Sequence, residues 1–238
     1  MKQVLLIGMQ HGNELLGDKL MNYIALHNPK LLESVDFVVG NPRAFKNKVR
    51  FIDTDMNRSY NKKSPEPSYE EIRANKVIEL IQATRYNLVL DLHTTTAKQP
   101  PCVIMSDFTD ATKKFLRCTD ISTVVKMPKD ITVHSLIGSC RQALSIEVNY
   151  EESSGSTLRN LVRSIVAFIN NSDTAKEVTV YEVESLLRVD DLTTNPGSQI
   201  QNFKALANGC YPVLLGETAY ESAGYLGFKA KKKYQLTV

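Results

Sequence analysis

The stretch QVLLIGMQHGNELLG (residues 3–17) decides the expected fold, because polar residues come directly after an apolar run. Residues 3–8 (QVLLIG) form a short continuous apolar run of the kind found in a buried central strand. Apolar residues then recur at helical spacing until Pro29, which ends the helix. The stretch therefore predicts one β-α unit, with His11 and Glu14 at the end of its strand.

The same alternation of strands and helices continues to about residue 174. Further strands are expected at residues 36–40, 86–93, 102–105, 122–126 and 143–148, and helices at residues 68–84 and 156–169. Residues 41–67 form a long polar segment, and long loops inside compact domains are usually functional or disordered. Strands that alternate with helices predict an α/β sheet with helices on both faces.

The pattern changes from about residue 175 onward. Apolar runs at residues 178–189, 211–215 and 234–238 are separated by turn signals, with little helical periodicity between them. We therefore expect two domains. Residues 1–174 would form the α/β domain, and residues 175–238 a small C-terminal β-rich subdomain.

Composition indicates an ordinary soluble globular protein. The 238 residues are 42% hydrophobic and 23% charged, with a net charge of +3, and the chain is long enough for one sizeable core. The basic run at residues 229–236 is more typical of a solvated edge strand than of a nucleic-acid surface. No stretch approaches the length of a membrane span, and the chain begins with a strand rather than a signal peptide. We expect a cytoplasmic protein that binds neither nucleic acid nor membranes.

The cysteines suggest neither a disulfide framework nor a thiolate zinc site. Cys102, Cys118, Cys140 and Cys210 are widely separated and form no CxxC pair. We expect reduced and mostly buried thiols.

Polar stretches follow three predicted strands, at residues 10–14, 91–96 and 145–150. In an open α/β sheet, ligands bind beyond the carboxyl ends of the strands, so these stretches should converge on one rim. A helix entered near Asn13 would direct His11 and Glu14 at one point, and His93 would arrive from a neighbouring strand end. Two imidazoles and one carboxylate, with a fourth position left for water, make a catalytic zinc set.

The pattern alone leaves other interpretations open. An HxxE pair such as His11 and Glu14 also serves as a surface ion pair or a helix cap. Asp91 lies two residues before His93, on the same side of the strand, and could orient its imidazole, but it could equally cap or pair elsewhere.

Taken in order, these motifs resemble the aspartoacylase and succinylglutamate desuccinylase family, zinc hydrolases related to the metallocarboxypeptidases. The resemblance rests on GxxHGNE, NPRA, RFIDTDMNR, DLHTTT, IEV ahead of GSTLR, and ETAY, and it spans nearly the whole chain. Residues 41–58 and 217–220 are closer to the aspartoacylase branch. The resemblance implies a zinc-carboxypeptidase-like mixed sheet and one zinc ion per chain, bound by His11, Glu14 and His93.

The resemblance also implies the catalytic residues. Glu147 would match the general base, which takes a proton from zinc-bound water and later delivers one to the departing amine. Arg50 would match the arginine that polarises the scissile carbonyl. From the pattern alone, Glu147 would rather be a strand-end carboxylate paired with an arginine. Asp53 and Asp55 could suggest a carboxylate metal pair, but we interpret them as residues that hold the arginines in place.

Substrate-binding residues follow from the same resemblance. Asn57 and Arg58 would hold the α-carboxylate, for which a guanidinium offers two parallel hydrogen bonds; the alternative is a loop arginine that caps carbonyls. Tyr220 would reach over the pocket from the C-terminal subdomain, or it is an ordinary half-buried tyrosine. Aspartoacylases read the substrate's side-chain carboxylate with an arginine upstream of the catalytic glutamate. Arg141 is the candidate here and Arg159 a second, although neither aligns cleanly.

The chain departs from the family pattern at residues 147–155 (EVNYEESSG), where acidic residues follow the IEV motif in place of the usual glycine. It is also shorter than typical members, so a more open pocket is expected.

The expected function is that of a zinc-dependent amidohydrolase that cleaves a small N-acyl amino acid, with aspartoacylase-like deacylation of an acidic N-acyl amino acid as the first choice. Succinylglutamate-type cleavage and a zinc-binding protein without turnover are the alternatives. A metal-dependent phosphoesterase using Asp53 and Asp55 is disfavoured, because no further carboxylate cluster or phosphate-binding glycine loop accompanies them. The sequence leaves a homodimer open.

Overall fold

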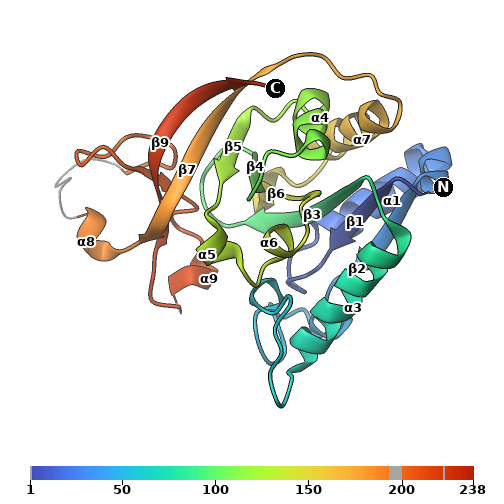
Figure 1. Cartoon of the computed structure of the whole chain (residues 1–238), viewed down its shortest axis with the longest axis horizontal. Helices are drawn as coiled ribbons and strands as arrows, with labels where there is room; N and C mark the ends of the chain where they lie inside the picture. Colours follow the sequence, from blue (N-terminus) through green and yellow to red (C-terminus); the bar gives the residue numbers. More distant parts are fainter. Residues whose placement is uncertain (1, 193–199, 222) are drawn as a thin grey trace.

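The protein is built around one twisted sheet, seen in a computed structural model that describes residues 2–192, 200–221 and 223–238 (Figure 1). Its strands in the described residues are β1 (Val4–Gly8), β2 (Val35–Val39), β3 (Leu88–Thr95), β4 (Cys102–Met105), β5 (Thr123–Lys126), β6 (Ala143–Asn149), β7 (Glu177–Leu187), β8 (Tyr211–Val213) and β9 (Gly227–Thr237). They lie in the order β2-β1-β3-β6-β4-β5-β7-β9-β8. From β1 to β6, the boundaries fall within two residues of those predicted.

The sheet is mixed. β1 is parallel to β2 and β3, β3 is parallel to β6, and β5 is parallel to β4 and β7. β4 runs antiparallel to β6, and β9 runs antiparallel to both β7 and β8. Because β1, β3 and β6 are parallel neighbours, their carboxyl ends lie at the same edge of the sheet.

Helices cover both faces, as expected (Figure 1). They are α1 (Leu16–His27), α2 (Pro42–Asn47), α3 (Tyr69–Thr84), α4 (Asp110–Cys118), α5 (Lys129–Thr132), α6 (Leu136–Ser139), α7 (Ser156–Ile169), α8 (Val189–Leu192) and α9 (Thr218–Glu221), with 3₁₀ turns η1 (Pro29–Glu33), η2 (Met56–Arg58) and η3 (Tyr150–Glu152). Leu5 and Ile7 of β1 share a buried core with residues of α3. Val4 and Leu6 share another core with residues of α1, α4 and α7. Both faces of β1 are therefore buried, which explains its continuous apolar run.

Local signals set the helix boundaries. The Ser68 hydroxyl accepts from the N–H of Glu71 and caps α3. Helix α4 was not predicted from the sequence; Thr109 caps it, and it buries Phe115 against Phe168 of α7.

The C-terminal strands continue the same sheet, because β7 pairs with β5. The boundary predicted at residue 175 falls between α7 and β7, and the two-domain division stays a prediction.

The basic run lies in β9, where β8 pairs only with residues 228–230. Beyond that point β9 pairs with β7 alone among the described residues, as expected for an edge. In the described part of the chain, no helix combines the length and apolar character that a membrane crossing needs.

Candidate active site

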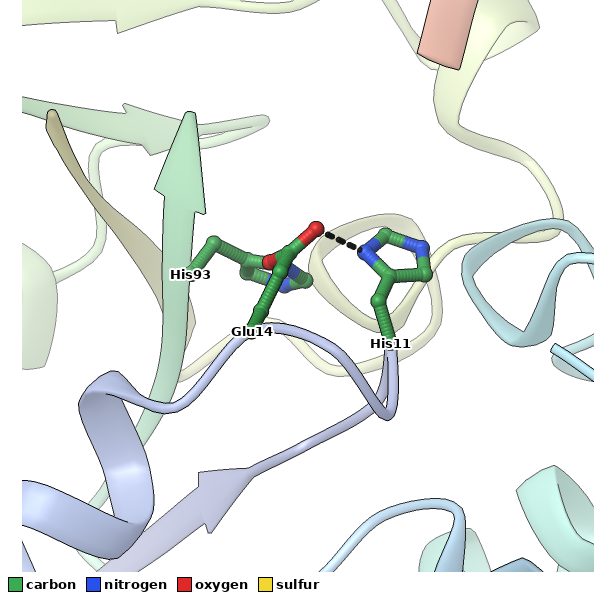
Figure 2. A group of neighbouring side chains, drawn as sticks. All are labelled: His11, Glu14 and His93. Carbon is green, nitrogen blue, oxygen red and sulfur yellow. Dashed lines mark hydrogen bonds and ion pairs between the residues drawn. The ribbon is translucent and has the colours of Figure 1, made fainter. Parts of the chain in front are cut away.

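His11, Glu14 and His93 converge at the edge where β1 and β3 end (Figure 2). All three residues are buried, and one ligand atom from each lies within 4.8 Å of the others. In the described residues, this is the one group of histidine, cysteine and acidic side chains that has the spacing of a metal site. The predicted ligand set is therefore brought together.

A tight turn, rather than the expected helix, brings His11 and Glu14 to one point. The N–H of Glu14 donates to the carbonyl of His11 at 3.0 Å, and α1 begins only at Leu16. A Cβ atom on Gly12, within this turn, would lie 2.1 Å from the backbone carbonyl carbon of Ala44. The HGNE turn thus requires a glycine in order to pack against α2.

Each imidazole lies between two carboxylates. His11 Nδ1 is 2.6 Å and His93 Nδ1 is 2.8 Å from the Glu14 carboxylate. The outer nitrogens, His11 Nε2 and His93 Nε2, lie 3.0 Å from Asp55 Oδ1 and 2.7 Å from Asp91 Oδ2. A carboxylate beside the second nitrogen is typical of metal-binding histidines, because it fixes the tautomer and the ring orientation.

The oppositely charged groups in this cluster stabilise one another. Burial opposes a charge on Glu14, but His11 and His93 outweigh it and hold the pKa of this carboxyl below its usual range. Burial also opposes protonation of the imidazoles, yet their carboxylate neighbours raise the pKa of His11 and raise that of His93 well above its ordinary value. Two nitrogens and one oxygen that converge in a buried site fit the donor set of a catalytic zinc ion. A zinc ion would displace the protons that the imidazoles carry when it binds.

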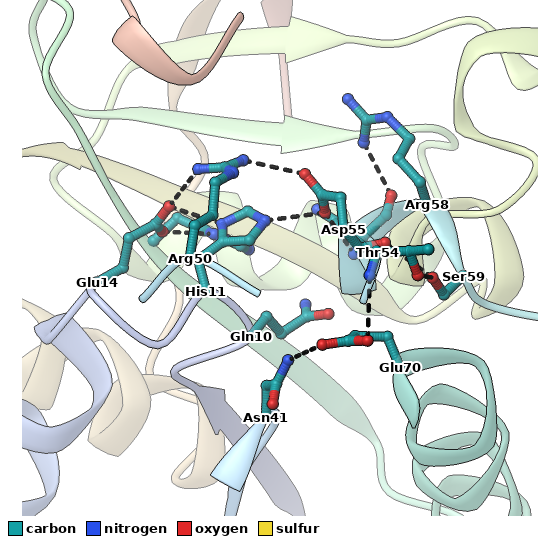
Figure 3. A network of polar contacts seen from close by, with 12 residues as sticks. Gln10, His11, Glu14, Asn41, Arg50, Thr54, Asp55, Arg58, Ser59 and Glu70 are labelled. Atoms are coloured by element: carbon teal, nitrogen blue, oxygen red, sulfur yellow. Dashed lines mark hydrogen bonds and ion pairs between the residues drawn. The ribbon is translucent and has the colours of Figure 1, made fainter. Parts of the chain in front are cut away.

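Arg50 lies beside the cluster as a fixed cation (Figure 3). Its Nη1 is 3.1 Å from Glu14 Oε1, and its Nη2 is 3.2 Å from Asp55 Oδ2. Asp55 therefore holds an arginine, as expected. Asp53 does not, because it is exposed and accepts from the N–H of Tyr69 at 2.9 Å. Since the two aspartates face different partners, they do not form the carboxylate pair that a phosphoesterase would need.

Glu147 lies opposite His93 in the register of β6 and β3. Its Oε2 is buried without a hydrogen-bond partner among the described residues, and the ion pairs of this region include no arginine on Glu147. Burial raises the pKa of this carboxyl to about 8; His93 lowers the pKa and Glu14 raises it. A carboxyl with a pKa near neutrality is suited to proton transfer, and a bound cation would shift the pKa down again.

A small cavity joins these groups. Its lining includes the predicted residues His11, Glu14, Arg50, Asn57, Arg58, His93, Glu147 and Tyr220. Asp55 accepts from the N–H of Asn57 at 2.8 Å and so caps η2, the turn that carries Asn57 and Arg58. Tyr220 comes from α9, so the C-terminal segment contributes one wall.

The structure does not bring Arg141 or Arg159 into this cavity. Arg141 is exposed and precedes β6, whereas Glu147 lies near the other end of that strand. Arg159 is exposed on α7. Neither arginine is positioned to read a substrate carboxylate next to Glu147.

Glu70 is a buried carboxylate whose role was not predicted from the sequence (Figure 3). It accepts from Asn41 Nδ2 at 2.9 Å and from three consecutive backbone N–H groups of residues 52–54 at 2.7, 3.1 and 3.2 Å. These bonds hold the loop between Arg50 and Asp55. An acidic residue in the first turn of a helix is usually interpreted as one that stabilises the start of that helix. The sequence pattern around Glu70 therefore does not indicate that this residue binds the backbone of residues 52–54.

Glu217 is a second carboxylate that holds a loop by hydrogen bonds, and in the sequence only the ETAY motif pointed to this residue. It accepts from Thr95 Oγ1 at 2.7 Å and from the N–H of Thr96 at 2.8 Å. These bonds tie the segment that carries Tyr220 to the end of β3.

Comparison with known proteins identifies the family of this chain. Residues 1–163 match the succinylglutamate desuccinylase/aspartoacylase catalytic domain. A probable aspartoacylase of Prochlorococcus marinus is 31% identical over 110 residues, a match that covers 44% of this chain and only 37% of that relative's length. The human N-acyl-aromatic-L-amino acid amidohydrolase (carboxylate-forming) is 24% identical over 297 residues, covering 100% of this chain and 92% of that protein.

A solved structure supports the fold assignment. Murine aminoacylase 3 superposes with a TM-score of 0.75 at 24% identity, covering 100% of this chain and 97% of that one. This likeness concerns the fold, while the family match covers more than half of the sequence. The chain therefore belongs to the succinylglutamate desuccinylase/aspartoacylase family.

Proposed function

We propose that the protein is a zinc-dependent amidohydrolase that cleaves an N-acyl amino acid into a carboxylic acid and a free amino acid. The convergence of His11, Glu14 and His93 with Glu147 and Arg50 around one cavity carries this proposal. The relatives are named for aspartate and for aromatic amino acids, so their shared element, an N-acyl amino acid, is what we carry over.

His11, Glu14 and His93 would hold one zinc ion per chain. A bound zinc ion supplies Lewis acidity, which lowers the pKa of water and polarises a carbonyl group. Asp55 and Asp91 keep the two imidazoles oriented through their outer nitrogens.

Glu147 is the proposed proton carrier. It takes a proton from the attacking water as the oxygen bonds to the carbonyl carbon, and it delivers a proton to the nitrogen as the C–N bond breaks. Its pKa near neutrality and its unpartnered Oε2 support this role, because such a group can both accept and release a proton and has no competing hydrogen bond at that oxygen.

Arg50 and Arg58 are the proposed substrate cations. Arg50 is fixed by Glu14 and Asp55, so its guanidinium can stabilise negative charge that develops on the carbonyl oxygen without moving. The oxygen of the Asn57 side chain accepts from the N–H of Leu136 at 3.2 Å, which leaves its NH₂ group as the end that donates to a carboxylate. Arg58 and Asn57 would thus bind the α-carboxylate.

Release of free amine from N-acetyl-L-amino acids tests this proposal. The full chain, reconstituted with zinc, should release amine from at least one member of a panel of acidic, aliphatic and aromatic substrates. Metal removal by a chelator should abolish the release, and zinc should restore it. Zinc binding without turnover on any member would contradict the proposal and favour a binding protein of the same fold.

A further inference from the structure

Two further cavities open from the reaction centre, one on each side. The inner cavity shares Asn57, Arg58, Glu147 and Tyr220 with the central cavity. The outer cavity shares a different set of residues with it, namely Glu14, Arg50, Thr94, Thr95 and Glu217. A bound substrate therefore has one place for each of its two ends.

The connectivity of an N-acyl amino acid decides which end lies where. The α-carboxylate and the side chain leave the same carbon atom, so a carboxylate held by Arg58 places the side chain at the inner cavity. The acyl chain leaves the carbonyl carbon, on the side of Arg50, and so points to the outer cavity. This assignment rests on the proposed function.

Eight of the fifteen residues that line the inner cavity are apolar. Its apolar lining includes Ile104, Val125, Met127, Ile137, Val213 and Phe228. Among the described residues that line it, Arg58 is the only basic side chain and Glu147 the only carboxylic acid, and both lie, with Tyr220, where it joins the central cavity. A second substrate carboxylate would meet no second cation there, and a buried charge without a partner is strongly disfavoured.

Apart from Tyr220, which the inner cavity shares with the central cavity, the hydroxyl groups of the lining are already hydrogen-bonded within the protein. Thr132 Oγ1 donates to the carbonyl of Pro128 at 3.1 Å, and Ser135 Oγ donates to the carbonyl of Thr132 at 2.9 Å. Ser145 Oγ donates to Asp91 Oδ2 at 3.1 Å. Each hydroxyl has one hydrogen, so these three offer no donor to a substrate carboxylate.

We infer that the enzyme prefers N-acyl amino acids whose side chain is apolar, either aliphatic or aromatic, over the acidic substrates expected from the aspartoacylase resemblance. An apolar side chain gains from burial against these walls, whereas an acidic one loses its hydration without replacement. The inner cavity is the specificity pocket, and Ile131 of α5 is a half-buried part of its wall.

Kinetics on N-acetyl-L-phenylalanine, -leucine, -methionine, -aspartate and -glutamate test this inference in the zinc-loaded full chain. The kcat/KM for the best apolar substrate should exceed that for aspartate by about 100-fold. Ile131→Arg adds a cation to the pocket and should reduce this ratio at least about tenfold. Val133→Arg is the matched control, because Val133 is 55% exposed and lies outside the lining, and it should leave the ratio unchanged.

The outcomes separate this inference from the proposed function. Cleavage of aspartate or glutamate substrates with equal or greater kcat/KM would overturn the inference and leave the proposed function standing. No cleavage of any substrate would overturn the proposed function, and the inference with it. The wild-type panel decides the question even if Ile131→Arg does not fold, and Ile131→Ala, which should favour phenylalanine over leucine by enlarging the pocket, provides a second variant.

Discussion

Glu147 and His93 lie directly opposite each other in the pairing of β6 with β3. Both strands are parallel to β1, whose end leads into the turn that carries His11 and Glu14. The proposed base and His93 are therefore fixed by the sheet itself, and His11 and Glu14 by the tight turn that follows β1. This placement gives each of them a distinct and testable role.

Glu147→Gln should reduce kcat by about 10²–10⁴-fold, because an amide cannot accept and return the proton. Zinc content and the circular dichroism spectrum should stay as in the wild type, since Glu147 is not among the three convergent ligands. Steady-state kinetics and elemental analysis of the same preparation check this. Retained turnover would remove Glu147 as the proton carrier.

Arg58→Ala should mainly raise KM, by roughly 10–100-fold, because it removes a charged hydrogen-bond partner of the α-carboxylate. The measurement compares each N-acyl amino acid with its carboxamide analogue, which lacks the charge. The variant should lose little on the carboxamide. An equal loss on both substrates would argue against recognition of the α-carboxylate.

Glu70→Ala should lower the free energy of unfolding by about 2–4 kcal/mol, because three backbone N–H groups and the Asn41 amide lose a buried acceptor. It should also lower kcat, since the same bonds hold the loop that carries Arg50. Glu79→Ala, an exposed site on the same helix, is the control and should change neither quantity. Urea denaturation and kinetics measure both effects, and a variant with wild-type stability would contradict the proposed role of Glu70.

The thiols should be unreactive in the native protein near neutral pH. Burial raises the pKa of Cys118 and of Cys140 to about 11, and it raises the pKa of Cys102 well above its ordinary value. A raised pKa means less thiolate, roughly one part in a thousand at pH 8 for a pKa of about 11, so reaction with Ellman's reagent should be slow and should accelerate as the pH rises. Unfolded protein should titrate all four thiols. Rapid reaction of the native protein at pH 8 would contradict this.

Much of the sheet could be predicted because buried parallel strands read as continuous apolar runs, as in β1 and β3. His11, Glu14 and His93 were predictable for a related reason, since polar residues that follow such runs must lie at one edge. The tight turn at Gly12 was not, because it depends on the close approach of α2, which no local pattern encodes.

The Arg141 prediction shows where proximity in sequence misleads. Arg141 is six residues before Glu147, but most of the residues between them belong to β6. Six residues of extended chain span about 20 Å, so the two side chains lie toward opposite ends of the strand. The converse holds for Glu217, which bonds to Thr95 from 122 residues away through tertiary structure alone.

Zinc content of the purified protein, measured by elemental analysis beside His93→Ala, shows whether His11, Glu14 and His93 bind a metal ion. We predict close to one zinc per wild-type chain after reconstitution and dialysis. The variant should lose most of it, because the site would retain only His11 and Glu14 of its three convergent ligands. A wild-type protein that holds no zinc, or a variant that holds as much as the wild type, would contradict the assigned metal site and the hydrolase built on it.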